Sequence, residues 1–201
     1  MRLKDKVAIV TGAANGIGAE ISRTFAREGC HVVLADLDEG KAAALAEEIM
    51  KETGVRTVAV GCDVAQKEAL QRVVDTCVAE FGTVDILVNN AGITLPACPV
   101  EDITPERWRK VLDIDLMGTI YGTQCVIPVM KAHKSGKIIN MASVAGQVGG
   151  VFTEATYPVS KAGVICWAKA VANQVGEYTI TCNSIAPGTI PTDSPETLGL
   201  P

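Results

Sequence analysis

Thr11-Gly12-Ala13-Ala14-Asn15-Gly16-Ile17-Gly18 follows a short β-branched run and precedes a segment of helical periodicity. The first glycine allows a tight turn, the second allows the backbone to approach a phosphate, and the third allows a helix and a strand to pack closely. The free N–H groups at the start of the helix would face a pyrophosphate, which the helix dipole also favours. A merely flexible turn would have the same composition, but the place of this one between a strand and a helix indicates a dinucleotide-binding turn.

Outward from this turn, short β-branched runs alternate with longer segments of helical period, which indicates parallel strands joined by crossover helices. We predict an α/β fold with a single Rossmann-type doubly wound parallel sheet and helices on both faces. The predicted strands cover 6–11, 31–35, 56–61, 85–89, 137–141 and 179–186. The predicted helices begin near 16 and cover 39–51, 70–81, 105–130 and 155–175.

The composition argues against several classes of partner. A net charge of -5 and the lack of a Lys/Arg run argue against nucleic acid and anionic membranes. The seven cysteines are scattered without a CxxC pair, so we expect buried thiols in a reducing compartment, the cytoplasm. His31 and His133 lack ligand-spaced neighbours, so no metal is expected. We also expect no signal peptide and no membrane span, because every apolar run is short.

Asp36 ends the second predicted strand and predicts which dinucleotide binds. A carboxylate at this position accepts hydrogen bonds from both adenosine ribose hydroxyls and repels a 2′-phosphate. Alternatively, Asp36 is the N-cap of the helix that follows. No Lys or Arg stands at Ala14, Asn15 or Leu37 to bind a 2′-phosphate, so we predict NAD rather than NADP.

Tyr157 and Lys161 stand four residues apart on a predicted helix, so their side chains project from the same face. A lysine ammonium beside a phenol favours the phenolate, and such a tyrosine can exchange a proton with a carbinol oxygen while hydride moves on a nicotinamide. A Tyr–Lys pair at this spacing is also common on protein surfaces. Ser143, directly after the fifth predicted strand, favours the catalytic interpretation because its hydroxyl can share the substrate oxygen with Tyr157.

Together these residues closely resemble the motifs of the short-chain dehydrogenase/reductase family. The matching segments, in family order, are the glycine turn, Asn89-Asn90-Ala91-Gly92, Ser143, Tyr157-Pro158-Val159-Ser160-Lys161 and Pro187-Gly188. Three residues separate the first two glycines, which in this family is typical of oxidoreductases rather than of epimerases or dehydratases.

The resemblance also implies roles for individual residues. Ser143 and Tyr157 would bind the carbonyl oxygen, while Tyr157 and Lys161 would lie against the cofactor, with Lys161 on the nicotinamide ribose. The further cofactor contacts that the resemblance implies come from Asp63 and Val64 beside the adenine, from Asn90, from Pro187, and from Ile190 at the carboxamide.

Asp115 departs from the family pattern, because relatives have an asparagine at its place in Leu112-Asp113-Ile114-Asp115-Leu116. That asparagine is thought to hold a water that relays protons behind the lysine. An aspartate accepts the same hydrogen bonds but adds a charge, which favours the ammonium form of Lys161. We therefore expect an altered pH dependence rather than inactivity.

The end of the chain is the second departure. Relatives continue beyond 187–188 with helices that cover the substrate and with a seventh strand that commonly joins subunits. We expect 1–201 to be one dinucleotide-binding and catalytic domain without that segment, through truncation or an open pocket. The Pro-, Thr- and Ser-rich stretch 189–201 is expected to begin a mobile substrate loop. The resemblance implies a homotetramer or a homodimer.

The leading hypothesis is an NAD-dependent oxidoreductase that interconverts a secondary alcohol and its ketone, with Tyr157 as general acid/base. Its rival is an NAD-binding, catalytically impaired sensor or scaffold, motivated by Asp115 and the short C-terminus. A purely structural α/β module would make all the motifs coincidental. The residues expected to line an apolar substrate pocket, which would suit cyclic alcohols, steroids and acyl chains alike, are Thr94, Leu95, Val148, Phe152 and Thr153.

Overall fold

A computed structural model describes residues 1–150 and 153–190 of the chain. Its six strands form one parallel sheet in the order β3-β2-β1-β4-β5-β6. The strands are β1 (Val7–Thr11), β2 (His31–Asp36), β3 (Thr57–Gly61), β4 (Ile86–Asn89), β5 (Gly136–Met141) and β6 (Ile180–Ile185). Each strand end lies within one residue of its predicted position, and the doubly wound parallel sheet is confirmed.

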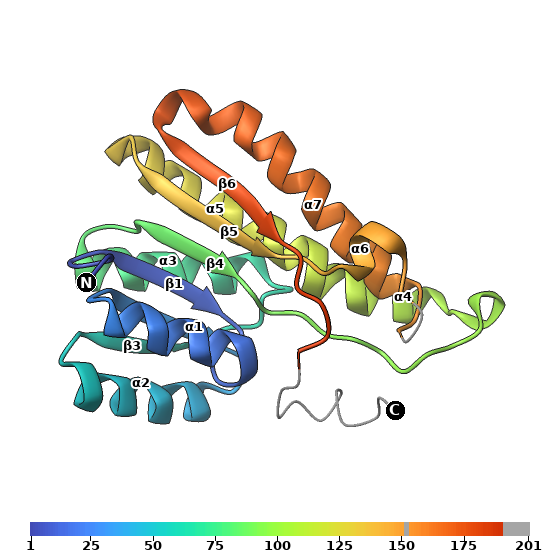
Figure 1. Cartoon of the computed structure of the whole chain (residues 1–201), viewed down its shortest axis with the longest axis horizontal. Helices are drawn as coiled ribbons and strands as arrows, with labels where there is room; N and C mark the ends of the chain where they lie inside the picture. The colour runs from blue at the N-terminus through green and yellow to red at the C-terminus, as the bar shows by residue number, and fades with distance from the viewer. Residues whose placement is uncertain (151–152, 191–201) are drawn as a thin grey trace.

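Helices cover both faces of this sheet (Figure 1). On one face lie α1 (Gly16–Arg27) and α2 (Glu39–Thr53). On the other lie α3 (Lys67–Phe81), α5 (Gly118–His133) and α7 (Thr156–Val175). The shorter elements are η1 (Val100–Asp102), α4 (Pro105–Val111), α6 (Ala145–Val148) and η3 (Gly176–Tyr178). None of the helices within the described residues has both the length and the apolar character that crossing a membrane requires.

Strand β1 is buried along its whole length because both of its faces are covered. Ala8 and Val10 pack with residues of α1 and α2, whereas Val7 and Ile9 pack with residues of α3, α5 and α7. This alternation follows the pleat of a strand, and the uninterrupted apolar run is typical of a central parallel strand. The glycine turn that follows β1 is therefore anchored in the core.

The glycine turn has the conformation that its sequence predicts. Gly12 and Gly16 have positive φ angles of 61° and 53°, a region that favours glycine. A Cβ atom at Gly18 would lie 2.1 Å from the carbonyl oxygen of Gly12, which leaves no space for a side chain. The third glycine therefore lets α1 pack directly against the end of β1.

The long helix predicted over 105–130 is interrupted by a π-helical segment, η2 (Leu112–Met117), between α4 and α5. The prediction of one continuous α-helix is wrong there, and Thr104 caps the start of α4. A π-helical turn holds one more residue than an α-helical turn, and such turns are frequent at functional sites. Asp115 lies in η2 and is fully buried.

All seven cysteines are free thiols, but the expectation that all are buried is wrong for two of them. Cys98 is partly exposed and Cys166, on α7, is exposed. Because α7 is largely apolar, the sequence does not indicate which of its faces is exposed to solvent.

Candidate active site

The carboxyl ends of β1 and β4 meet where the strand order reverses, and a cavity of about 390 Å³ opens there. Open α/β sheets bind ligands at such a switch point. In Figure 1 the arrowheads of the strands and the segments that follow β1, β4 and β5 lie at this edge. The residues that line the cavity are Gly12, Asn15, Gly16, Ile17, Asp36, Leu37, Cys62, Asp63, Val64, Asn90, Ala91, Gly92, Ile93 and Ile114.

Asn90 supports the glycine turn from the neighbouring strand. Its Nδ2 donates hydrogen bonds to the carbonyl oxygens of Thr11 and Gly12 at 2.9 and 3.0 Å. The hydroxyl of Thr11 in turn accepts hydrogen bonds from the backbone N–H groups of Asn90 and Ala91 at 3.0 and 3.1 Å. The two loops at the switch point therefore hold one another, with the N-terminus of α1 facing the cavity.

Asp36 lies at the wall of the cavity with both carboxylate oxygens already oriented. Oδ2 accepts a hydrogen bond from the N–H of Ala14 at 2.8 Å, and Oδ1 accepts one from the N–H of Asp38 at 3.0 Å. The N-cap of α2 is Asp38, whose side chain accepts from the N–H of Lys41. The alternative interpretation of Asp36 as the helix N-cap is therefore wrong.

Asp63 and Val64 form the outer wall of the same cavity, after β3. The carboxylate of Asp63 is exposed and accepts a hydrogen bond from the N–H of Ala65 at 3.0 Å. Val64 is buried beneath Gly118, where a Cβ atom would lie 3.0 Å from Val64. Gly118, the first residue of α5, therefore leaves space for the side chain of Val64 at the cavity wall.

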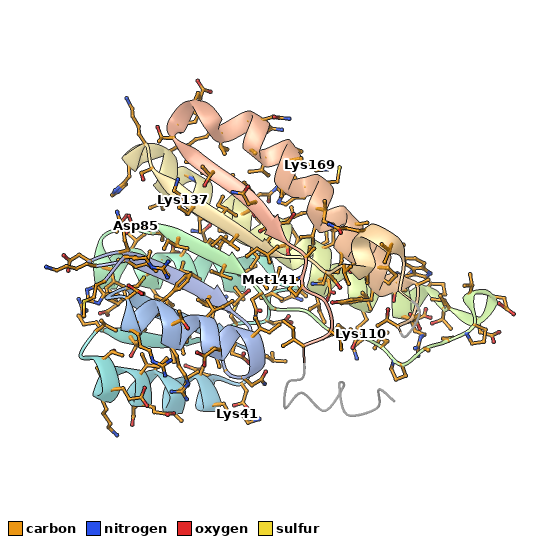
Figure 2. All side chains as sticks on the ribbon, viewed as in Figure 1. Lys41, Asp85, Lys110, Lys137, Met141 and Lys169 are labelled. Atoms are coloured by element: carbon orange, nitrogen blue, oxygen red, sulfur yellow. The ribbon has the colours of Figure 1, made fainter. Side chains whose placement is uncertain are left out.

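Lys161 and Asp115 form a buried ion pair behind the cavity. Nζ of Lys161 lies 3.4 Å from Oδ2 of Asp115 and donates a hydrogen bond to the carbonyl oxygen of Met141 at 3.1 Å. Figure 2 labels Met141 at the carboxyl end of β5, far from Lys137 at the other end. A Cβ atom at Gly92 would lie 3.0 Å from Nζ, so this glycine leaves space for the ammonium group.

Asp115 receives further hydrogen bonds from the segments around it. Oδ1 accepts from the N–H of Ile93 at 2.8 Å, and Oδ2 lies 3.3 Å from the hydroxyl of Ser160. Burial raises the pKa of the Asp115 carboxyl, while the Lys161 ammonium and the Ile93 N–H oppose the shift. The carboxylate therefore depends on these partners for its charged form.

Tyr157 lies in the first turn of α7, with the ammonium of Lys161 5.5 Å from the centre of its ring. Ser143 follows β5, and its hydroxyl accepts a hydrogen bond from the N–H of Ala145 at 3.1 Å. Helix α6 then packs on α7, where a Cβ atom at Gly146 would lie 2.7 Å from the backbone of Lys161. The predicted catalytic residues thus come from neighbouring elements at the same edge of the sheet.

Pro187 and Ile190 lie beyond β6, outside the set of residues that lines the cavity. The carbonyl oxygen of Pro187 accepts a hydrogen bond from the N–H of Val144 at 3.0 Å, and Ile190 is 44% exposed. Residues 191–201 of the predicted substrate loop lie outside the described residues.

The five residues expected to line a substrate pocket differ in their exposure. Thr94, Leu95 and Thr153 are partly buried, and Val148 is 76% exposed. Phe152 lies outside the described residues.

Sequence reasoning missed several residues of the site. Leu37, Cys62, Ile93 and Ile114 line the cavity, and the N–H of Ala14 orients Asp36. Most of these residues are next in the sequence to a predicted site residue. That adjacency is the only feature of the sequence that could have identified them. The structure also shows an ion pair between Arg107 and the buried Glu154, 47 residues apart, for which the sequence gives no such signal.

The comparisons with known proteins match almost the whole chain. A family model described as short chain dehydrogenase matches residues 6–199. The trans-4-hydroxycyclohexanecarboxylate dehydrogenase of Sinomonas cyclohexanicum is 43% identical over 99% of this chain and 77% of its own length. The galactitol 2-dehydrogenase of Agrobacterium fabrum is 41% identical over 94% of this chain and 72% of its own length.

Two further matches are a reductase and a solved structure. The 3-oxoacyl-[acyl-carrier-protein] reductase of Synechocystis is 38% identical over 98% of this chain and 78% of its own length. A crystal structure of NAD+-bound xylitol dehydrogenase superposes with a TM-score of 0.89 at 33% identity, covering 94% of this chain and 72% of that one.

Proposed function

The chain belongs to the short chain dehydrogenase family and is an oxidoreductase of that family, and from this premise we propose that it uses NAD to interconvert a secondary alcohol and its ketone. The observation that carries the proposal is the set of Tyr157, Lys161 and Ser143 at the edge of the sheet that also holds the glycine-turn cavity. The relatives named above act on alcohols and ketones of different shapes, so the substrate is proposed only as a small secondary alcohol or ketone.

The cavity fits a nicotinamide dinucleotide on three counts. Gly12 and Gly16 have the positive φ that brings backbone close to a phosphate, the start of α1 faces the cavity, and Asp36 offers an oriented carboxylate for ribose hydroxyls. Asp63 and Val64 would hold the adenine end, and Lys161 the nicotinamide ribose. Pro187 and Ile190 are proposed beside the nicotinamide. When bound, the nicotinamide supplies the hydride acceptor for alcohol oxidation.

The residues of the chain perform the proton chemistry in this proposal. Tyr157 removes the hydroxyl proton of the alcohol during oxidation and returns it during ketone reduction. The Lys161 ammonium, held by the Met141 carbonyl and the Asp115 carboxylate, lies 5.5 Å from the centre of the Tyr157 ring, where its charge would stabilise the negative charge that develops on the tyrosine during proton transfer. The Ser143 hydroxyl donates a hydrogen bond to the substrate oxygen, so the oxygen stays oriented as its charge changes.

The same proposal keeps residues 1–201 as one catalytic domain, places the protein in the cytoplasm, and has it act as a homodimer or a homotetramer. The scattered cysteines, without a CxxC pair, support the reducing compartment. The alternative of an NAD-binding sensor or scaffold is less well supported, because all three proposed catalytic side chains are present around a buried, paired Lys161.

A turnover assay tests the proposed reaction. We expect NADH to form when the protein is incubated with NAD and a panel of linear, cyclic and polyhydroxylated secondary alcohols, as followed by absorbance. The same panel of ketones should consume NADH. Tight NADH binding without turnover of any member would favour the sensor or scaffold instead.

Asp115→Asn is expected to shift the pH profile of alcohol oxidation to lower pH by roughly one unit. The carboxylate, 3.4 Å from the Lys161 ammonium, partly cancels the positive charge that Lys161 presents to Tyr157. Without it, the Lys161 ammonium presents its full positive charge to the Tyr157 ring 5.5 Å away, so removal of the alcohol proton is easier and the rising limb of the rate moves to lower pH. The maximal rate should remain within about tenfold of the parent, since the asparagine still accepts the Ile93 hydrogen bond.

Asp113→Asn is the matched control for this prediction. Asp113 lies on the same π-helical segment but its side chain is exposed, so its profile should match that of the parent. An Asp115→Asn profile that coincides with both would show that the carboxylate has no influence on the reacting proton.

A further inference from the structure

Arg107 and Glu154 form an ion pair that the chemistry proposed above does not use. Glu154 precedes Tyr157 by three residues, and its side chain is 0% exposed. Oε2 accepts a hydrogen bond from Nε of Arg107, and Oε1 accepts one from the hydroxyl of Thr156 at 2.8 Å. Since a buried carboxylate is costly unless it is paired and hydrogen-bonded, both oxygens of Glu154 need these donors.

The guanidinium of Arg107 joins three segments of the chain. Arg107 lies in the first turn of α4, where its backbone N–H donates to the side chain of Thr104. While Nε binds Glu154, Nη2 donates a hydrogen bond to the carbonyl oxygen of Pro96 at 2.8 Å. Because the fork of a guanidinium is planar and rigid, the two bonds fix the direction from Pro96 to Glu154. We call this arrangement the Arg107–Glu154 clamp.

The clamp connects the segments on the two sides of the proposed catalytic residues. Segment 93–96 follows β4, and its start is held by the hydrogen bond from Ile93 to Asp115 at 2.8 Å. On the other side, the carbonyl oxygen of Glu154 accepts a hydrogen bond from the N–H of Tyr157 at 3.1 Å. Figure 1 shows α4 beside the start of α7, with the segment after β4 leading to α4.

The clamp and the dinucleotide cavity are separate parts of the site. Neither Arg107 nor Glu154 is among the residues that line the cavity, which are contributed mainly by the segments after β1, β2, β3 and β4. Ile93, which lines the cavity, is held by Asp115 rather than by the clamp. Loss of the clamp would therefore loosen residues 94–96 and the first turn of α7, and leave the glycine turn and Asp36 in place.

We propose that Arg107 and Glu154 are positioning residues that hold segment 93–96 against the first turn of α7, and so set how the substrate meets Tyr157. This inference rests on the proposed oxidoreductase function and deepens it, because it assigns substrate fit to a pair of residues outside the catalytic set. A substrate that binds between the two segments depends on their spacing, whereas the dinucleotide does not.

Kinetics of Arg107→Gln and Glu154→Gln test the proposal. Each variant should raise KM for the alcohol at least tenfold, lower kcat by a smaller factor, and leave the Kd for NADH within about twofold of the parent. The double variant should lie closer to the parent than Arg107→Gln does, because it leaves no buried charge without a partner. Arg107→Lys keeps the charge but not the fork, so partial recovery of KM is expected.

Arg23→Gln is the matched control, since Arg23 also binds a glutamate, Glu48, through hydrogen bonds of 2.9 Å, but on the exposed surface of α1 and α2. It should change neither KM nor kcat. Clamp variants with parental KM and kcat would overturn the proposal, as would variants in which the Kd for NADH rises as much as KM.

Amide hydrogen exchange tests the clamp apart from the reaction. Arg107→Gln and Glu154→Gln should speed exchange in 93–99 and 153–160 without changing α2, and Arg23→Gln should not affect either segment. If the parent turns over no alcohol, the proposed function fails while this comparison still decides the clamp. Unchanged exchange in both segments would then refute it.

Discussion

Tyr157→Phe is expected to lower kcat for alcohol oxidation by about 10³-fold, within the range attributed to a general acid/base. The substitution removes only the phenolic oxygen and keeps the ring that lies 5.5 Å from the ammonium of Lys161. Because the dinucleotide cavity does not depend on that oxygen, the Kd for NADH should stay within about threefold of the parent. Steady-state rates and NADH fluorescence titrations measure the two quantities.

Tyr178→Phe is a control with the same chemistry at a distant place. Tyr178 lies on η3, before β6, and the ammonium of Lys131 is 4.3 Å from the centre of its ring. The control therefore removes a phenolic oxygen from another Tyr–Lys pair, and its kcat should equal that of the parent. A Tyr157→Phe enzyme that keeps more than a tenth of the parental kcat would assign the proton transfer to a different group.

Asp36→Asn is expected to reduce the preference for NADH over NADPH by roughly 30-fold. Unit charges about 4 Å apart interact by about 1 kcal/mol in water and by about 4 kcal/mol at an effective dielectric constant of 20. A 2′-phosphate carries up to two negative charges, so its repulsion by the Asp36 carboxylate amounts to roughly 2 kcal/mol at this partly exposed site. The Kd values of NADH and NADPH, measured by fluorescence for both proteins, give the change in preference.

The parent protein itself should bind NADH more tightly than NADPH. Asp38→Asn removes a charge from the same turn, but the carboxylate of Asp38 faces Lys41 and caps α2. An asparagine also caps helices well, so this control should keep the parental preference within about threefold. If the parent bound NADPH as tightly as NADH, the assignment of NAD and the role of Asp36 would both be wrong.

The hydrophobic periodicity of the sequence predicted most of the fold. Short β-branched runs between helical segments specify a parallel sheet, because each run is buried on both faces and each helix buries one stripe. This periodicity did not predict the π-helical segment η2. Its residues 112–117 have the composition of an ordinary helix, and only the structure shows that Asp115, within this segment, contacts Ile93 and Lys161.

The candidate site likewise has features that the sequence predicts and features that only the structure shows. The glycine turn and the Tyr157–Lys161 spacing are local features, so the conformation of a strand–turn–helix unit and the pitch of one helix were enough to predict them. The roles of these residues in catalysis and in cofactor binding stay predictions. The choice between the two interpretations of Asp36 needed the structure, because its partner Ala14 lies 22 residues away.

The sequence by itself determined the parallel sheet, the dinucleotide turn and the face on which Tyr157 and Lys161 stand. The family resemblance placed Asp115 near Lys161, but only the tertiary structure showed that the two form a direct ion pair and that Arg107 pairs with Glu154, 47 residues apart. The physical reason is that periodicity reports whether a side chain faces the core, whereas the partner of a buried charge depends on which distant segment the fold brings to the same place.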